Sequence, residues 1–76
     1  MYVIADRDKA AAAGFAADLH RTEGRWMVLN EKEVRFAAGL EGTLAERAAE
    51  LGGKVYTYAE ARDFLAELRR EYHVDV

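Results

Sequence analysis

The sequence contains no cysteine, no serine and no proline. Without cysteine, the chain cannot form disulfide bridges, cysteine-ligated zinc sites or a cysteine nucleophile, and without serine it has no serine nucleophile. It also lacks an apolar run of the ~18 residues that a membrane span needs, and a basic segment followed by an apolar stretch near its start. We therefore expect a cytoplasmic protein with no membrane association. The length of 76 residues predicts a single domain over residues 1–76.

The chain has no concentrated positive charge. Its 14 acidic and 11 basic residues give a net charge of −3 and are interspersed. The densest basic pair, Arg69-Arg70, is flanked by Glu67 and Glu71. Nonspecific binding to nucleic acid requires several Lys and Arg residues on one face, so we expect no nucleic-acid partner.

Three short apolar runs predict β-strands, at residues 2–5, 26–29 and 54–58. The first two are apolar at every position, which is typical of strands in a sheet that is covered on both faces. The third places two tyrosines, Tyr56 and Tyr58, on one side. This alternation favours an edge strand with one wetter, aromatic face.

Helices are predicted between and after these strands. The first is expected over about residues 8–23, with Gly24 as the residue that ends it. Three pairs have the spacing of a capping box and predict further helix starts: Asn30 with Glu33, Thr43 with Glu46, and Thr57 with Glu60. The alternation of Val34-Arg35-Phe36 also permits a short strand, and the tail 73–76 permits a small additional strand or a frayed end.

The resulting order is β-α-β-α-α-β-α, which predicts an α/β, Rossmann-like fold. Strands that alternate with helices favour parallel pairing through right-handed crossovers. We therefore expect a three-stranded parallel sheet of order 2-1-3, with helices on both faces.

In such a sheet, polar residues at the strand ends converge on one rim, where ligands bind. Asp6 and Asp8 follow the first strand, and Asn30 follows the second. These side chains could hold Mg²⁺ or a phosphate. An apolar strand followed by Asp-x-Asp resembles the start of haloacid-dehalogenase-type phosphatases, although Ala10 stands where that pattern usually has Thr or Val. The alternative interpretation is structural: one aspartate caps the following helix and the other complements its dipole.

Aromatic residues on the strands suggest a contact surface instead. Trp26, Tyr56 and Tyr58 are of the types favoured at the centre of protein interfaces, although strand aromatics commonly fill cores, and on that interpretation Trp26 packs under a helix. Lys54 is the single charge on the predicted edge strand, and such an edge can pair with another chain. A homodimer or a contact with another protein is therefore expected through residues 54–58.

The sequence also resembles small uncharacterised α/β proteins encoded by phages of actinobacteria. The resemblance lies in the opening YVIAD with its alanine-rich continuation, in RWMVLN and in GLEGT, within about the first 43 residues. It implies a compact cytoplasmic protein that acts on a host protein, and it supplies no catalytic residue. Our leading prediction is a non-enzymatic protein-binding module without cofactor or metal. The alternative is a small metal-dependent hydrolase or nucleotide-binding domain that uses Asp6, Asp8 and Asn30.

Overall fold

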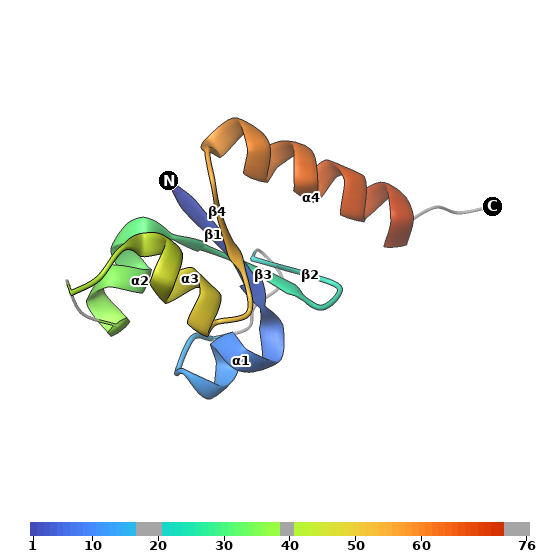
Figure 1. Ribbon diagram of the computed structural model, residues 1–76. Helices are drawn as coiled ribbons and strands as arrows, with labels where there is room; N and C mark the ends of the chain where they lie inside the picture. The colour runs from blue at the N-terminus through green and yellow to red at the C-terminus, as the bar shows by residue number, and fades with distance from the viewer. Residues whose placement is uncertain (17–20, 39–40, 73–76) are drawn as a thin grey trace.

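The structure, a computed structural model, describes residues 1–16, 21–38 and 41–72. It consists of one β-sheet with helices on both faces (Figure 1). In chain order the elements are β1 (Tyr2–Asp6), α1 (Arg7–Ala12), β2 (Thr22–Glu23), β3 (Trp26–Asn30), α2 (Glu31–Ala38), α3 (Leu44–Glu50), β4 (Lys54–Tyr56) and α4 (Tyr58–Tyr72).

The sheet is four-stranded and antiparallel, so the predicted parallel, Rossmann-like α/β fold is wrong. Its order is β2-β3-β1-β4. Both neighbours of β1 run antiparallel to it: Tyr2 pairs with Asn30 on one side and with Tyr56 on the other, and Asp6 pairs with Trp26. The architecture is therefore α+β.

The direction of β3 follows from the short α1 and from a hairpin. Instead of a helix over residues 8–23, α1 spans six residues and gives way to a turn in which Gly14 has φ +100°. The chain returns beside β1 through the hairpin β2–β3, where Glu23 pairs with Trp26 across Gly24-Arg25. Gly24 has φ +60°, which suits the first central position of a two-residue type II′ turn. Gly24 thus turns a hairpin and does not end a helix.

The expected helical crossover does occur, but between β3 and β4. Both strands are antiparallel to β1, so they are parallel to each other, and β1 lies between them. The chain connects them through α2 and α3. The pattern of strand, two helices and strand therefore does indicate a parallel relation for this segment, whereas β1 does not belong to the same parallel set.

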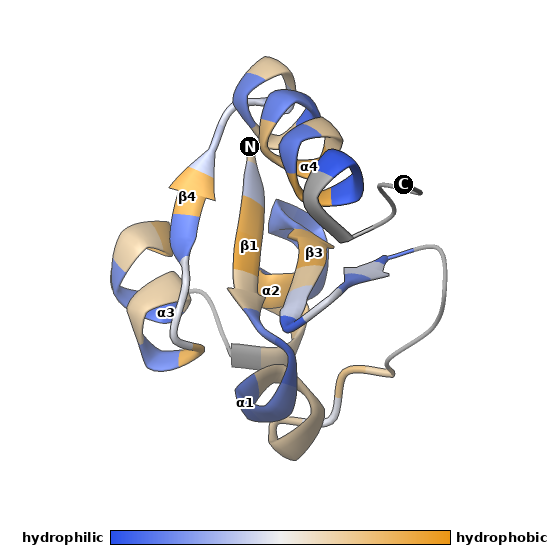
Figure 2. Cartoon of the chain, turned by 90° about the vertical axis from the view of Figure 1, so that its right-hand side faces the viewer, coloured by the Kyte–Doolittle hydropathy of each residue, from blue (hydrophilic) through white to orange (hydrophobic). Residues whose placement is uncertain are grey.

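Each face of the sheet has its own layer of helices. Alternate residues of the strands point to opposite faces. One face packs against α1, α2 and α3 in a continuous core that contains Val3, Ala5, Ala10, Met27, Leu29, Val34, Leu44, Ala48 and Leu51. The other face carries the buried Ile4 and lies under α4, whose buried residues are Ala61 and Leu68. Figure 2 shows the apolar strands between the two helical layers.

All three predicted capping boxes are confirmed. The side chain of each first residue accepts a hydrogen bond from the amide three positions later, and the glutamate there accepts one from the first residue's amide. The two distances are 2.8 and 3.1 Å for Asn30–Glu33, 3.1 and 2.9 Å for Thr43–Glu46, and 3.1 and 2.9 Å for Thr57–Glu60. The ambiguous stretch Val34–Phe36 is helical, within α2. The tail 73–76 lies outside the described residues.

Loss of the α4 cap should lower the stability of the protein more than loss of the α2 cap. Thr57→Ala is expected to lower the free energy of unfolding by about 0.5–2 kcal/mol, and by more than Asn30→Ala, because Thr57 begins a helix of 15 residues and Asn30 one of 8. Urea denaturation followed by circular dichroism measures both. A larger loss in Asn30→Ala would contradict this ranking.

Candidate functional site

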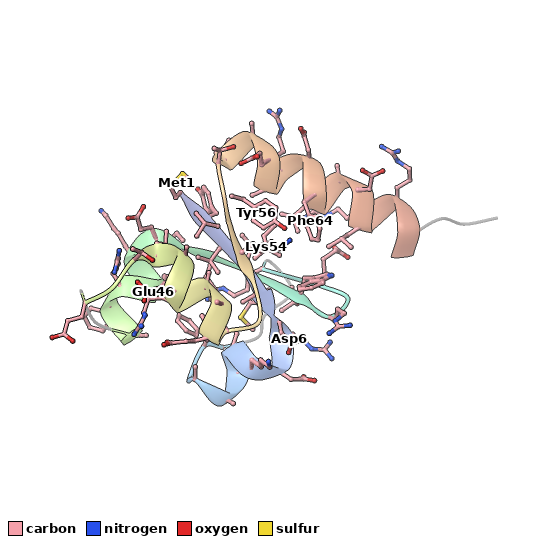
Figure 3. All side chains as sticks on the ribbon, viewed as in Figure 1. Met1, Asp6, Glu46, Lys54, Tyr56 and Phe64 are labelled. Atoms are coloured by element: carbon pink, nitrogen blue, oxygen red, sulfur yellow. The ribbon has the colours of Figure 1, made fainter. Side chains whose placement is uncertain are left out.

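The predicted strand-end rim does not form, because the sheet is antiparallel. Asp6 lies at the end of β1 that pairs with Trp26, whereas Asn30 pairs with Tyr2 at the opposite end. The two ends of β1 are four residue steps apart, which corresponds to roughly 14 Å. Figure 3 shows Asp6 and Met1 at opposite ends of β1. The residues proposed to share a metal or phosphate are therefore divided between two sides of the molecule.

Asp6 is the N-cap of α1 and its carboxylate is fully engaged. One oxygen accepts hydrogen bonds from the amides of Asp8 and Lys9, at 3.0 and 3.1 Å, and the other accepts one from the guanidinium of Arg25 at 3.2 Å. This confirms the structural interpretation of the Asp-x-Asp stretch. The second aspartate, Asp8, is 88% exposed and lies 3.7 Å from Arg7 Nε on the surface.

Hydrogen bonds at helix starts lower the pKa of two carboxyl groups, Asp6 and Glu46. The pKa of Asp6 is held below its usual value, first by the Lys9 amide and then by the Arg25 side chain. The pKa of Glu46 is lowered by the amide and then the hydroxyl of Thr43. A carboxyl group whose pKa is lower in the folded than in the unfolded state stabilises the fold above its ordinary pKa. That stabilisation is lost as the pH falls, because the unfolded chain then binds more protons.

Asp6→Asn should make the stability of the fold less dependent on pH in the acidic range. Asparagine is also a good N-cap but does not titrate, so the variant should show a smaller fall in thermal midpoint than the wild type between about pH 5 and pH 3. Thermal denaturation by circular dichroism over this pH series measures the difference, with Asp8→Asn as the exposed control. Identical pH profiles for wild type and Asp6→Asn would contradict the role of Asp6. Since the Asp6 carboxylate is already occupied, Mg²⁺ should not raise the midpoint of either protein.

Two of the proposed interface aromatics attach α4 to the sheet. Trp26 meets Phe64 edge-on with ring centres 5.9 Å apart, and Tyr56 lies 5.6 Å from the same ring. Figure 3 shows Tyr56 and Phe64 together between β4 and α4. Arg25 stacks over the Trp26 ring at 5.2 Å. The interpretation that Trp26 packs under a helix is thus confirmed.

The other two interface candidates lie on the surface. Lys54 is exposed at the start of β4, and β4 is an edge of the sheet that the described residues form. Tyr58 is 65% exposed and its ring contacts that of Tyr2 at 5.8 Å. The edge that β4 offers for strand pairing is three residues long.

The surface between α1, α2, α3 and the turn at residues 13–15 is concave, and we call this concave region the helical hollow. It consists of two adjoining depressions of about 510 and 710 Å³ that share Ala13, Phe15 and Ala37. The first extends towards Val34 and Leu51, and the second towards Phe36. Charged residues from the three helices line it as well: Lys9, Lys32, Glu33, Arg47 and Glu50.

Phe36 is a candidate that the sequence pattern did not single out. Its side chain is 95% exposed, the highest value among the exposed large apolar residues of the described ranges. Val34, two positions earlier, is completely buried. In a strand these two residues would share a face, but in a helix they lie about 200° apart. The capping box Asn30–Glu33 had already predicted this helix, and helical spacing from it would have placed Phe36 on the outward side.

No protein-family model, curated protein or solved structure matches the chain. The resemblance to phage-encoded proteins therefore stays a prediction. Within the described ranges, no group of three or more His, Asp or Glu side chains is arranged to hold a metal ion. No helix in the same part of the chain combines the length and the apolar character that a membrane crossing requires.

Proposed function

We propose that this protein is a non-enzymatic protein-binding module and that its binding surface is the helical hollow. The observation that carries the proposal is Phe36, a large apolar side chain that is 95% exposed beside an open apolar depression. Covering such a side chain is worth about 1.5–3 kcal/mol. Exposed aromatics that border a concave apolar surface are typical anchors of protein interfaces.

The geometry gives less support to the hydrolase alternative. The aspartate in the nucleophile-like position, Asp6, is committed to the α1 amides and to Arg25. Its supposed partner Asn30 lies at the other end of β1 and forms a capping box with Glu33. Both groups thus have a structural role, and neither faces the other across a pocket.

Self-association through β4 is a second candidate, which the exposed edge and Tyr58 favour. An edge strand with unpaired backbone groups can add a strand from another chain. The short β4 limits this contact to about three residues, whereas the helical hollow draws on three helices. We therefore place the main contact at the hollow. If the chain is phage-encoded, as its resemblance implies, the partner is a host protein.

Two matched variants separate these surfaces. Phe36→Asp and Tyr58→Asp each replace an exposed aromatic ring with a carboxylate, one at the hollow and one beside β4. Tagged wild type and both variants would be used to capture proteins from native cells, with identification by mass spectrometry. Light scattering would measure self-association of the purified proteins.

The proposal expects a protein that the wild type and Tyr58→Asp capture but Phe36→Asp does not. Phe36→Asp should keep the thermal midpoint close to that of the wild type, because the change is on the surface, whereas Tyr58→Asp should lower it slightly, because it also removes the contact with the Tyr2 ring. Loss of capture or of a dimer in Tyr58→Asp alone would move the function to the β4 edge. A wild type that is monomeric and captures nothing would overturn the proposal.

A further inference from the structure

We infer that the helical hollow receives an amphipathic helix whose apolar side is bordered by acidic residues. This inference rests on the proposed function and specifies the chemistry of the partner. Two observations carry it: the distribution of unpaired charge around the hollow, and the way the hollow divides into two adjoining depressions.

The carboxylates at the hollow are already neutralised. One carboxylate oxygen of Glu33 forms an ion pair with Arg21 at 2.6 Å, and the other accepts a hydrogen bond from the amide of Asn30 at 3.1 Å. Glu50 forms an ion pair with Arg47 at 3.0 Å. Neither glutamate is therefore available to attract a basic partner.

The two lysines at the hollow are exposed cations. Lys9 lines the first depression and Lys32 the second, and neither forms an ion pair within the described residues. Although the chain has a net charge of −3, the uncompensated charge at this surface is positive among the residues that the structure describes. Opposite charges at the border of an interface accelerate encounter and select the partner, so the complementary ligand carries Asp or Glu at its margins.

The shape favours a helix over an extended peptide. The hollow is lined by α1, α2, α3 and the turn at residues 13–15, and within the described ranges it offers no strand edge to which a peptide backbone could pair. Two depressions that meet at Phe15 suit two apolar side chains on successive turns of one helix. Phe36, which is exposed on α2 at the second depression, would then contact the bound helix.

A displayed library of random peptides tests the inference while the natural partner is still unidentified. Peptides of about sixteen residues, or ~four helical turns, would be selected on the wild type and depleted on Phe36→Asp. The expected winners have apolar residues at helical spacing bordered by Asp and Glu, and they become helical on binding. Winners that are basic at these borders, or that bind in an extended form, would overturn the inference.

The three lysines of the chain provide matched variants. Lys9→Glu and Lys32→Glu should each lower the affinity for the selected acidic peptide by about threefold to tenfold, and by less at high salt. Lys54→Glu, on β4 and outside both depressions, makes the same charge change and should leave affinity unaltered. Equal affinity in all three variants would overturn the charge argument.

These results distinguish failure of the inference from failure of the proposed function. Peptides that depend on Phe36 but not on Lys9 or Lys32 would leave the binding module in place and refute the acidic partner. A selection that yields no Phe36-dependent peptide would refute both. Wild-type self-association that Phe36→Asp abolishes would show that a second copy occupies the hollow, which also overturns the acidic-helix partner.

Discussion

Gly53→Ala is expected to leave most of the protein unfolded. A Cβ atom at this position would overlap the carbonyl oxygen of Ile4 and lie 2.7 Å from the Cα of Ala5. Both atoms belong to the backbone of the central strand, so no side-chain rotation can relieve the clash. To accommodate the methyl group, either β4 must move away from β1 or the backbone of β1 must shift. We expect a loss above about 4 kcal/mol, which is most of the stability of a domain this small.

Gly14→Ala is the matched control for this change. It introduces the same methyl group where nothing lies within 4 Å, although φ is +100°. The cost should be limited to backbone strain, about 1–3 kcal/mol. Urea denaturation and amide NMR spectra would compare the two variants. If Gly53→Ala were folded and no less stable than Gly14→Ala, the close approach of residue 53 to β1 would be refuted.

Phe64→Ala is expected to detach α4 from the sheet. The Phe64 ring contacts both Trp26 and Tyr56, so its removal opens a cavity between the helix and the strands. Truncation of a core phenylalanine costs about 3–5 kcal/mol, and a half-buried one somewhat less. Trp26 is the single tryptophan of the chain, and its fluorescence should shift to the red as water reaches it.

Phe36→Ala removes the same number of atoms from an exposed site. Because Phe36 is 95% exposed, its stability effect should stay within about 0.5 kcal/mol. Trp26 fluorescence should not change. A loss comparable to that of Phe64→Ala would mean that Phe36 supports the fold, and would remove the observation on which the proposed function rests.

The contrast between these two phenylalanines separates stability from recognition. Phe64 faces the sheet and joins the aromatic layer beneath α4. Phe36 faces away from the core, beside an open depression that α2 and the turn at residues 13–15 line. A protein that keeps its fold without the Phe36 ring but loses its partner would demonstrate that this ring was retained for binding.

Local structure was predictable where residues close in sequence make the decisive contacts. Each capping box joins residues only three positions apart, so Asn30, Thr43 and Thr57 identified the starts of α2, α3 and α4. The apolar runs identified β1, β3 and β4 in the same way. The C-terminal end of α1 was predicted poorly, because the alanine-rich stretch favours a longer helix. The positive φ of Gly14, which accompanies the turn after α1, arises only in the folded chain.

Strand direction was decided by the tertiary structure. A strand that is apolar at every position has the same pattern in both directions, so the apolar run 26–29 is compatible with parallel and antiparallel pairing. The turn at Gly14 and the hairpin at Gly24 return the chain antiparallel to β1. Because of this reversal, Asn30 lies at the opposite end of β1 from Asp6, and the predicted strand-end rim does not form.

By itself, the sequence determined the helix caps, the apolar strands and the absence of cysteine and serine chemistry. Only the tertiary structure decided which of the remaining side chains meet. Asp6 receives Arg25 from the hairpin, Phe64 reaches Trp26 across 38 positions, and the helical hollow requires three helices to converge. Such contacts depend on strand direction and helix packing, which local propensity does not encode because the contacting residues are distant in the chain.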